Sequence, residues 1–257
     1  MNSAPDIYEQ AARAATLPDP KLNVSEWADT YRILSQRSSP EPGPWRTSRA
    51  PFLKAIMDDL SVSSPVERVV FQKGAQIGGT ELGNCWVGYV IHMAPGPMLV
   101  VQPTNEMARR NSKQRINPLI EDCEVLRTRV HDARMRDSGN TVLGKEFQNG
   151  ILVMTGANSG KGLRSMSARY LFLDEVDGYP GDVDKEGDPC ELAIARTTNF
   201  SNRAKIYICS TPTISGRSRI EKFYEASDQR HYWVPCPHCG DAGARDGAVA
   251  LAEERGR

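Results

Sequence analysis

The chain has 257 residues, of which 39% are hydrophobic and 25% are charged. This length allows one large α/β domain or one domain with a small appendage, and this composition excludes wholesale disorder. Lysine plus arginine equals aspartate plus glutamate, at 32 each, so the formal net charge is zero. A protein that coats nucleic acid non-specifically is strongly basic, so any DNA contact must come from a local patch.

Nothing in the sequence points to secretion or to a membrane. The cysteines are too few for a disulfide scaffold, and four of them lie in separate segments: Cys85, Cys123, Cys190 and Cys209. That distribution suits a reducing compartment. Residues 1–20 lack the pattern of a secretory signal, and no apolar stretch approaches the roughly 18 residues that span a bilayer. We expect a soluble protein of the host cytoplasm with no membrane partner.

Residues 1–40 are predicted to form a helical arm. An amphipathic pattern at 7–15 is followed by Trp27, Tyr31 and Leu34 at helical spacing. Three prolines and a glycine then predict a loop at 38–45, and a helix is expected at 50–60.

From residue 69 onward, short apolar strands alternate with helices. Helices are predicted at 81–92 and 105–120, and strands at 69–72, 97–102, 150–155, 168–173 and 204–210. This alternation predicts an α/β fold, with a mostly parallel central sheet flanked by helices on both faces.

A glycine-rich segment, KGAQIGGT at 73–80, follows the first of these strands. An ordinary phosphate-binding loop is GxxxxGK[ST], whose backbone amides cradle phosphate oxygens. Here Gly79 stands at the usual lysine position, and the lysine stands at the front as Lys73. Thr80 would offer its hydroxyl to Mg²⁺, and the nucleotide would contact Lys73, Gly74, Ala75, Gln76, Ile77, Gly78, Gly79 and Thr80. A glycine-rich turn of any α/β protein is the alternative interpretation.

Two later strands end in polar residues. Asp174 and Glu175 close the apolar run at 170–173, where in P-loop ATPases the first acid holds Mg²⁺ and the second polarises the attacking water. Ser210 and Thr211 close the strand at 204–210, a position that senses the γ-phosphate in such ATPases. Taken alone, each could be an ordinary strand ending in a polar turn, with Asp177 extending the acidic one. Together with the loop at 73–80, they favour a nucleotide site.

The front-placed lysine in 73–80, the LFLDE box at 171–175 and the STPT segment at 210–213 together resemble the lambda-like GpA family of phage terminase large subunits. The segments at 25–52 and 156–165 are also similar, so the resemblance covers about residues 20–240. It implies a P-loop NTPase of the RecA-like, additional-strand type that uses ATP and Mg²⁺. In that family Lys73 would contact phosphate, Asp174 would bind Mg²⁺, Glu175 would be the catalytic carboxylate, and Ser210 and Thr211 the coupling element.

The resemblance also suggests residues around the nucleotide. Trp45 and Arg46 would lie near the adenine, although Trp45 could equally anchor the arm to the core. Arg164 is the first candidate for the arginine that stabilises γ-phosphate charge, ahead of Arg109 and Arg110. A cluster of Arg109, Arg110, Lys113 and Arg115 could follow a DNA backbone, although such runs are also ordinary solvated helix faces.

The C-terminal residues fit the family less well. Cys236 and Cys239 form half of a zinc knuckle, and neither His231 nor His238 completes it convincingly, so zinc is not expected. The Ala/Gly/Arg-rich residues 242–257 show no strand signal, and we expect a frayed end or a truncated terminus. The predicted organisation is an arm at 1–40, a P-loop ATPase domain at 41–230 and a partial knuckle with an unpatterned tail at 231–257.

These observations predict the ATP-hydrolysing part of a terminase large subunit, which translocates double-stranded DNA into a procapsid. The expected partners are DNA, the small terminase subunit, the portal protein and further copies of the chain in a homo-oligomer. The family's nuclease domain is not expected within these residues. A helicase-like translocase and a truncated prophage remnant that binds nucleotide without packaging DNA are the alternatives.

Overall fold

A computed structural model describes residues 21–37, 39–130, 140–233 and 249–254. The helix expected at 7–15 therefore lies outside the described residues. None of the helices that are described is long and apolar enough to cross a membrane.

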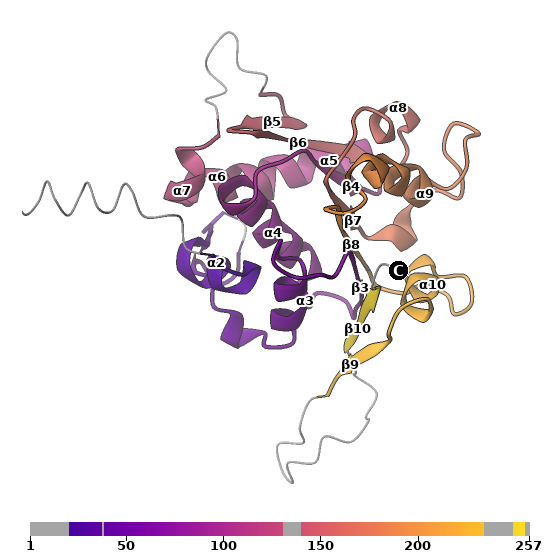
Figure 1. Cartoon of the computed structure of the whole chain (residues 1–257), viewed down its shortest axis with the longest axis horizontal. Helices are drawn as coiled ribbons and strands as arrows, with labels where there is room; N and C mark the ends of the chain where they lie inside the picture. The colour runs from indigo at the N-terminus through magenta and orange to yellow at the C-terminus, as the bar shows by residue number, and fades with distance from the viewer. Residues whose placement is uncertain (1–20, 38, 131–139, 234–248, 255–257) are drawn as a thin grey trace, which may run out of the picture.

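The centre of the fold is an eight-stranded sheet with the strand order β5-β6-β4-β7-β8-β3-β10-β9 (Figure 1). Neighbours are parallel from β6 through β4, β7 and β8 to β3, while β5, β10 and β9 join through antiparallel pairs. In this order the strands are β5 (Gly144–Phe147), β6 (Gly150–Gly156), β4 (Met98–Gln102), β7 (Tyr170–Asp174), β8 (Lys205–Ser210), β3 (Arg68–Gln72), β10 (Val249–Glu254) and β9 (Arg230–Tyr232).

The predicted fold class is confirmed. Strand β8 lies between β3, which precedes the glycine-rich loop, and β7, which ends in the acidic pair. A strand inserted between these two is the feature expected of the additional-strand type. A separate two-stranded sheet joins β1 (Ile33–Leu34) to β2 (Gly43–Pro44).

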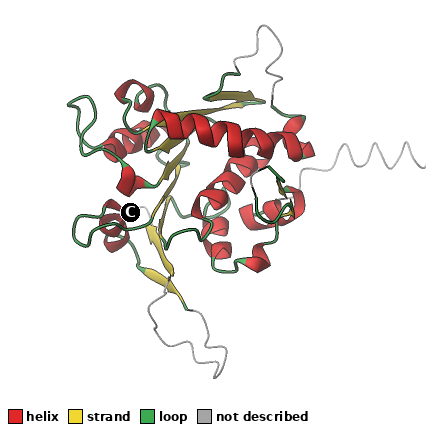
Figure 2. Cartoon of the chain, turned by 180° about the vertical axis from the view of Figure 1, so that it is seen from behind, coloured by secondary structure: helices red, strands yellow, loops and turns green. Residues whose placement is uncertain are grey.

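Helices cover both faces of the sheet (Figures 1 and 2). One face carries α2 (Val24–Tyr31), α3 (Leu53–Asp59), α4 (Gly79–Met93), α6 (Asn117–Asp122) and α7 (Glu124–Arg127). The other carries α8 (Gly160–Leu163), α9 (Pro189–Ile194) and α10 (Arg219–Glu225). Short 3-10 turns complete the connections: η1 (Thr47–Arg49), η3 (Val176–Gly178) and η4 (Ala195–Phe200). The buried apolar residues form two clusters, one on each face of the sheet, because the parallel strands carry apolar side chains on both faces.

Helix α4 passes through the larger cluster, and two glycines let it pack closely. A Cβ atom at Gly83 would lie 2.2 Å from the ring of Phe172 on β7, and one at Gly88 would lie 2.2 Å from the ring of Trp27 on α2. These glycines therefore bring the helix against the sheet on one side and against the N-terminal helix on the other. The position of α4 matters because its first residue closes the glycine-rich loop.

Most predicted elements occur within two residues of their expected limits. The helix expected at 105–120 is instead three consecutive pieces, α5 (Asn105–Asn111), the π-helical turn η2 (Ser112–Ile116) and α6. The prediction that residues 242–257 contain no strand is wrong, because β10 pairs antiparallel with β3. Strand β3 would otherwise leave its edge groups unpaired, and the VALAEE segment supplies the missing partner.

Candidate active site

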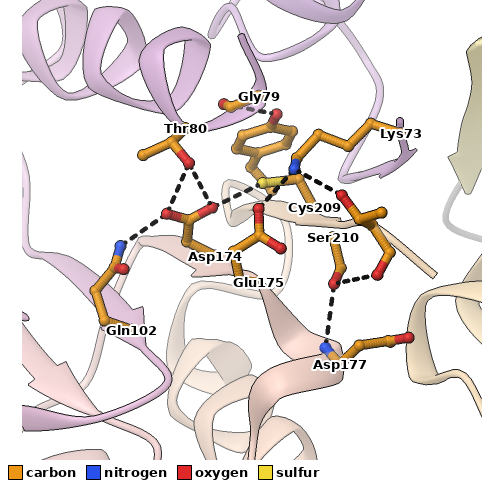
Figure 3. Close-up of polar contacts among 11 residues, drawn as sticks. Lys73, Gly79, Thr80, Gln102, Asp174, Glu175, Asp177, Cys209 and Ser210 are labelled. Atoms are coloured by element: carbon orange, nitrogen blue, oxygen red, sulfur yellow. Dashed lines mark hydrogen bonds and ion pairs between the residues drawn. The ribbon is translucent and has the colours of Figure 1, made fainter. Parts of the chain in front are cut away.

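Polar side chains gather where the parallel strands of the sheet end. The carboxyl ends of β3, β4, β7 and β8 lead into the glycine-rich loop, Gln102, the acidic pair and Ser210, respectively. Ligands of open α/β sheets bind at this edge. Three motifs that are about 30 to 100 residues apart in the sequence thus meet in space (Figure 3).

The loop at 73–78 has the backbone of an anion-binding turn. Gln76 and Gly78 have φ angles of 61° and 92°, in the left-handed region. Helix α4 begins directly afterwards at Gly79, so its N-terminal backbone amides and the positive end of its dipole face this loop.

Gly79 explains how a lysine can stand at the front of the loop. A Cβ atom at position 79 would lie 2.6 Å from Cδ of Lys73, so the lysine side chain occupies the space that a larger residue would need. The chain of Lys73 thus folds back across the start of α4. That its ammonium group takes over the role of the usual lysine at position 79 stays a prediction.

Lys73 joins the three motifs. Its Nζ atom donates to Oε1 of Glu175 at 2.6 Å and to Oγ1 of Thr211 at 3.3 Å, and its backbone amide donates to the carbonyl of Ser210 at 3.0 Å (Figure 3). The side chain is only 5% exposed, which limits screening of its charge by water.

Asp174 lies in a buried cluster of donors. Its carboxylate accepts from Oγ1 of Thr80 at 3.0 Å, from Nε2 of Gln102 at 2.9 Å and from the thiol of Cys209 at 3.2 Å. Burial raises the pKa of the Asp174 carboxyl, although the bonds from Gln102, Cys209 and Thr80 oppose that effect. A carboxylate and a hydroxyl are the hard oxygen ligands that Mg²⁺ prefers, and a divalent cation would offset the cost of the buried charge. The residues present therefore fit Mg²⁺.

Glu175 is held by its backbone in an unusual conformation. Its φ angle is 54°, which an L-residue with a side chain seldom adopts, and its amide donates to the carbonyl of Cys209 at 2.8 Å. This turn separates the two carboxylates: Asp174 points toward Thr80, whereas Glu175 points toward Lys73 (Figure 3). Strained residues of this kind are concentrated at functional sites.

The contacts of Trp45 and Arg164 are with residues outside this cluster. Trp45 is buried, and its indole N–H donates to Oγ1 of Thr47, which fits the anchoring alternative; Arg46 beside it is exposed. Arg164 donates to the carbonyl of Gly160 at 3.1 Å and pairs with Glu186 at 2.8 Å. Their roles at the nucleotide stay predictions.

The basic cluster is split. Arg109, Arg110 and Lys113 are exposed, whereas Arg115 turns toward α4 and lies 3.7 Å from Glu81. Glu81 also pairs with buried Arg32, so the N-terminal segment is tied to the helix that follows the loop. Cys236, Cys239 and His238 lie outside the described residues, and His231 contacts the hydroxyl of Tyr224 at 3.0 Å.

Three residues of the site were not predicted from the sequence. Gln102 and Cys209 both bond to Asp174, and the hydroxyl of Tyr207 donates to the carbonyl of Gly79 at 3.1 Å. Gln102 had a usable signal, since it is a polar residue that ends an apolar parallel strand. Cys209 and Tyr207 lie within an apolar strand, where nothing in the pattern separates them from core residues.

Known proteins are similar to this chain in sequence. Residues 39–246 match the family model described as phage terminase large subunit gpA, ATPase domain. The chain belongs to this family. The resemblance inferred from the sequence is therefore confirmed.

Two curated relatives are the terminase large subunits of Enterobacteria phage P21 and Escherichia phage lambda. The first is 31% identical over 224 residues, covering 86% of this chain and 34% of the relative. The second is 30% identical over 245 residues, covering 94% of this chain and 37% of the relative. The chain thus spans about a third of the length of these relatives.

The fold also occurs among solved structures. The crystal structure of the HK97 bacteriophage large terminase superposes with a TM-score of 0.59 at 15% identity, covering 79% of this chain and 40% of that one. At this identity the likeness supports the fold alone.

Proposed function

We propose that this chain binds ATP with Mg²⁺ at the loop 73–80 and hydrolyses it to move double-stranded DNA into a viral procapsid. The observation that carries the proposal is the position of Lys73, whose ammonium contacts both Glu175 and Thr211 beside the N-terminus of α4. Membership of the gpA ATPase family supports the same chemistry.

Each residue then has a part in hydrolysis. Lys73 and the amides at the start of α4 bind the triphosphate, and Asp174 and Thr80 would hold the Mg²⁺. Bound there, the cation neutralises negative charge on the phosphate oxygens. Glu175 accepts a proton from the water that attacks the γ-phosphorus, and the bond to the ADP oxygen breaks. Ser210 and Thr211 report the presence of the γ-phosphate.

The partners belong to the same proposal. The large subunits of phages P21 and lambda are terminases, and a packaging role implies DNA, a small terminase subunit and a portal. Arg164 would act on the nucleotide of a neighbouring copy, which requires a homo-oligomer. The basic residues Arg109, Arg110 and Lys113 would contact the DNA backbone.

A steady-state ATPase assay with and without double-stranded DNA tests the proposal. Loss of a general base slows reactions by about 10²–10⁴-fold, so we expect that loss in Glu175→Gln. The exposed Glu225→Gln on α10 removes the same charge away from the site and should retain full activity. Wild-type turnover no greater than that of Glu175→Gln would overturn the enzyme function and leave nucleotide binding alone. Stimulation by single-stranded DNA in preference to duplex would favour the helicase-like alternative.

A further inference from the structure

The turn that follows Glu175 and the loop that follows Ser210 are joined through one residue, Asp177. Its backbone amide donates to Oγ of Ser210 at 3.2 Å (Figure 3). Its carboxylate accepts through Oδ2 from the amide and hydroxyl of Thr213, at 3.0 and 3.2 Å, and through Oδ1 from the amide of Ile220 at 2.9 Å. Asp177 therefore bonds to the end of β8, to the next loop and to α10.

Arg219, in the first turn of α10, also bonds to the turn that contains Asp177. Its guanidinium donates to the carbonyls of Val176, Tyr179 and Pro180, at 3.3, 2.8 and 2.5 Å, and pairs with Asp188 at 2.9 Å. The turn at 176–180 and the start of α10 thus form one connected unit.

Capping of α10 accounts for only part of the bonding of Asp177, namely its bonds with the side chain of Ser218 and the amide of Ile220. The N-cap of α10 is Ser218, whose side chain accepts from the amide of Glu221, and Glu221 in turn binds the amide of Gly216 at 2.7 Å. The helix and its loop have their own local bonds. The contacts of Asp177 instead run between elements that lie about 35 to 45 residues apart in the sequence.

The catalytic groups lie immediately beside this link. Glu175 is two residues before Asp177, and its carboxylate accepts a bond from the ammonium of Lys73. The backbone amide of Lys73 donates to the carbonyl of Ser210. Any shift of Ser210 relative to Glu175 must stretch the bonds of Asp177. Their separation is therefore fixed from both sides, by Lys73 within the site and by Asp177 behind it.

We propose that Asp177 is a positioning residue that holds Glu175 in register with Ser210 and Thr211, and that carries changes at the γ-phosphate into the loop 211–218 and α10. The proposal rests on the ATPase function proposed above. It deepens that function, because it names the connection between the base and the coupling element.

Asp177→Asn is a sharp test because asparagine has a single acceptor oxygen. It can hold either the amide of Thr213 or that of Ile220, but not both. Asp182→Asn is a matched control: Asp182 also accepts two backbone amides, from Lys185 and Gly187, but within its own loop. Turnover, KM for ATP, affinity for a fluorescent ATP analogue and melting temperature are measured for each.

We expect Asp177→Asn to lower kcat by about 10-fold or more, the worth of one bond to a charged group, with nucleotide affinity within about twofold of wild type. Asp182→Asn should keep the wild-type kcat. Three results would each overturn the inference. They are an unchanged kcat in folded Asp177→Asn, an equal fall of kcat in Asp182→Asn, and a loss of nucleotide affinity that parallels the loss of kcat. Wild type without turnover would instead overturn the proposed function, and this inference with it.

A second pair of variants decides the matter if Asp177→Asn fails to fold. Thr213→Val removes only the hydroxyl bond to Asp177, whereas Thr213→Ser keeps it. We expect kcat to fall by about fivefold in the valine variant and to be restored by serine, with KM unchanged. Equal kcat values in the two variants would count against the link.

Discussion

Two contacts compete for the ammonium group of Lys73 in the proposed function. Its ammonium donates to Glu175 at 2.6 Å, and in the proposed function the same group binds the phosphates of ATP. A triphosphate that attracts Lys73 would weaken its hold on Glu175 and free that carboxylate to accept a proton. In the proposed function, binding of ATP and release of Glu175 would thereby be linked through the buried ammonium of Lys73.

This dual role predicts the effect of Lys73→Ala. Bonds between charged groups are worth about 1.5–3 kcal/mol, so nucleotide affinity should fall by about 10–100-fold. Titration with a fluorescent ATP analogue measures it, with the exposed Lys54→Ala as a control for loss of a surface charge. An unchanged dissociation constant in Lys73→Ala would show that the front-placed lysine does not bind phosphate.

We expect the contribution of Asp177 to the stability of the fold to depend on pH. Burial raises the pKa of its carboxyl, but hydrogen bonds from the side chain of Ser218 and from the amides of Ile220 and Thr213 outweigh burial, so the pKa lies below its ordinary value. A carboxyl with a depressed pKa stabilises the fold above its unfolded-state value of about 3.9, and that contribution is lost as the pH falls through the folded-state value. The stability difference between wild type and Asp177→Asn should therefore be constant above about pH 5 and shrink in more acid solution.

Urea unfolding at several values between about pH 7 and about pH 3.5 measures this difference. A difference that grows on acidification would contradict the assigned direction of the pKa.

At the scale of elements, the packing of α4 depends on the absence of a side chain at Gly83. Gly83→Ala would place a methyl group 2.2 Å from the ring of Phe172 as measured in the present structure, so the helix or the ring must move. Overpacking of this kind costs about 1–3 kcal/mol. Urea unfolding should show that loss, whereas Gly181→Ala, where no atom lies within 4 Å of the added Cβ, should be nearly neutral. Equal stability of the two variants would mean that α4 adjusts freely.

The exposed residues Arg109, Arg110 and Lys113 make a second prediction at this scale. Each phosphate contact contributes about 0.9 to the slope of log K against log salt, so removing all three as alanines should lower that slope by up to about 3. Basal ATPase should be unchanged while duplex affinity falls. The scattered set Arg127→Ala, Lys185→Ala and Arg203→Ala removes the same charge from exposed sites without forming a patch. If that set lost affinity for duplex DNA equally, the net charge of the protein, and not a DNA-binding surface formed by α5 and η2, would explain the effect.

Across the whole molecule, the sequence revealed the parallel sheet because its strands are buried on both faces. Segments such as 98–102 and 170–174 are then continuous apolar runs, and the polar residues that end them mark the edge where ligands bind. The same pattern predicted that Lys73, Asp174 and Ser210 would come together. It could do so because parallel strands end at a common edge, whatever their separation in the chain.

Other features depend on contacts that no local pattern records. Strand β10 exists through pairing with β3, and its small residues carry little strand signal of their own. Cys209 bonds to Asp174 only because β8 is placed beside β7. The burial of Trp45 depends on tertiary packing, which periodicity does not specify.

The left-handed backbone of Glu175 has a practical consequence. An L-residue with a side chain pays about 1–2 kcal/mol in this conformation, whereas glycine adopts it readily. Among replacements that delete the carboxylate, glycine is thus the one that relieves the strain. Glycine at this position would also leave the buried ammonium of Lys73 without its ion pair, so the relief of strain is set against the cost of an unpaired charge. Any selection for more stable variants of this domain should therefore also measure ATP turnover in each variant that is changed at position 175.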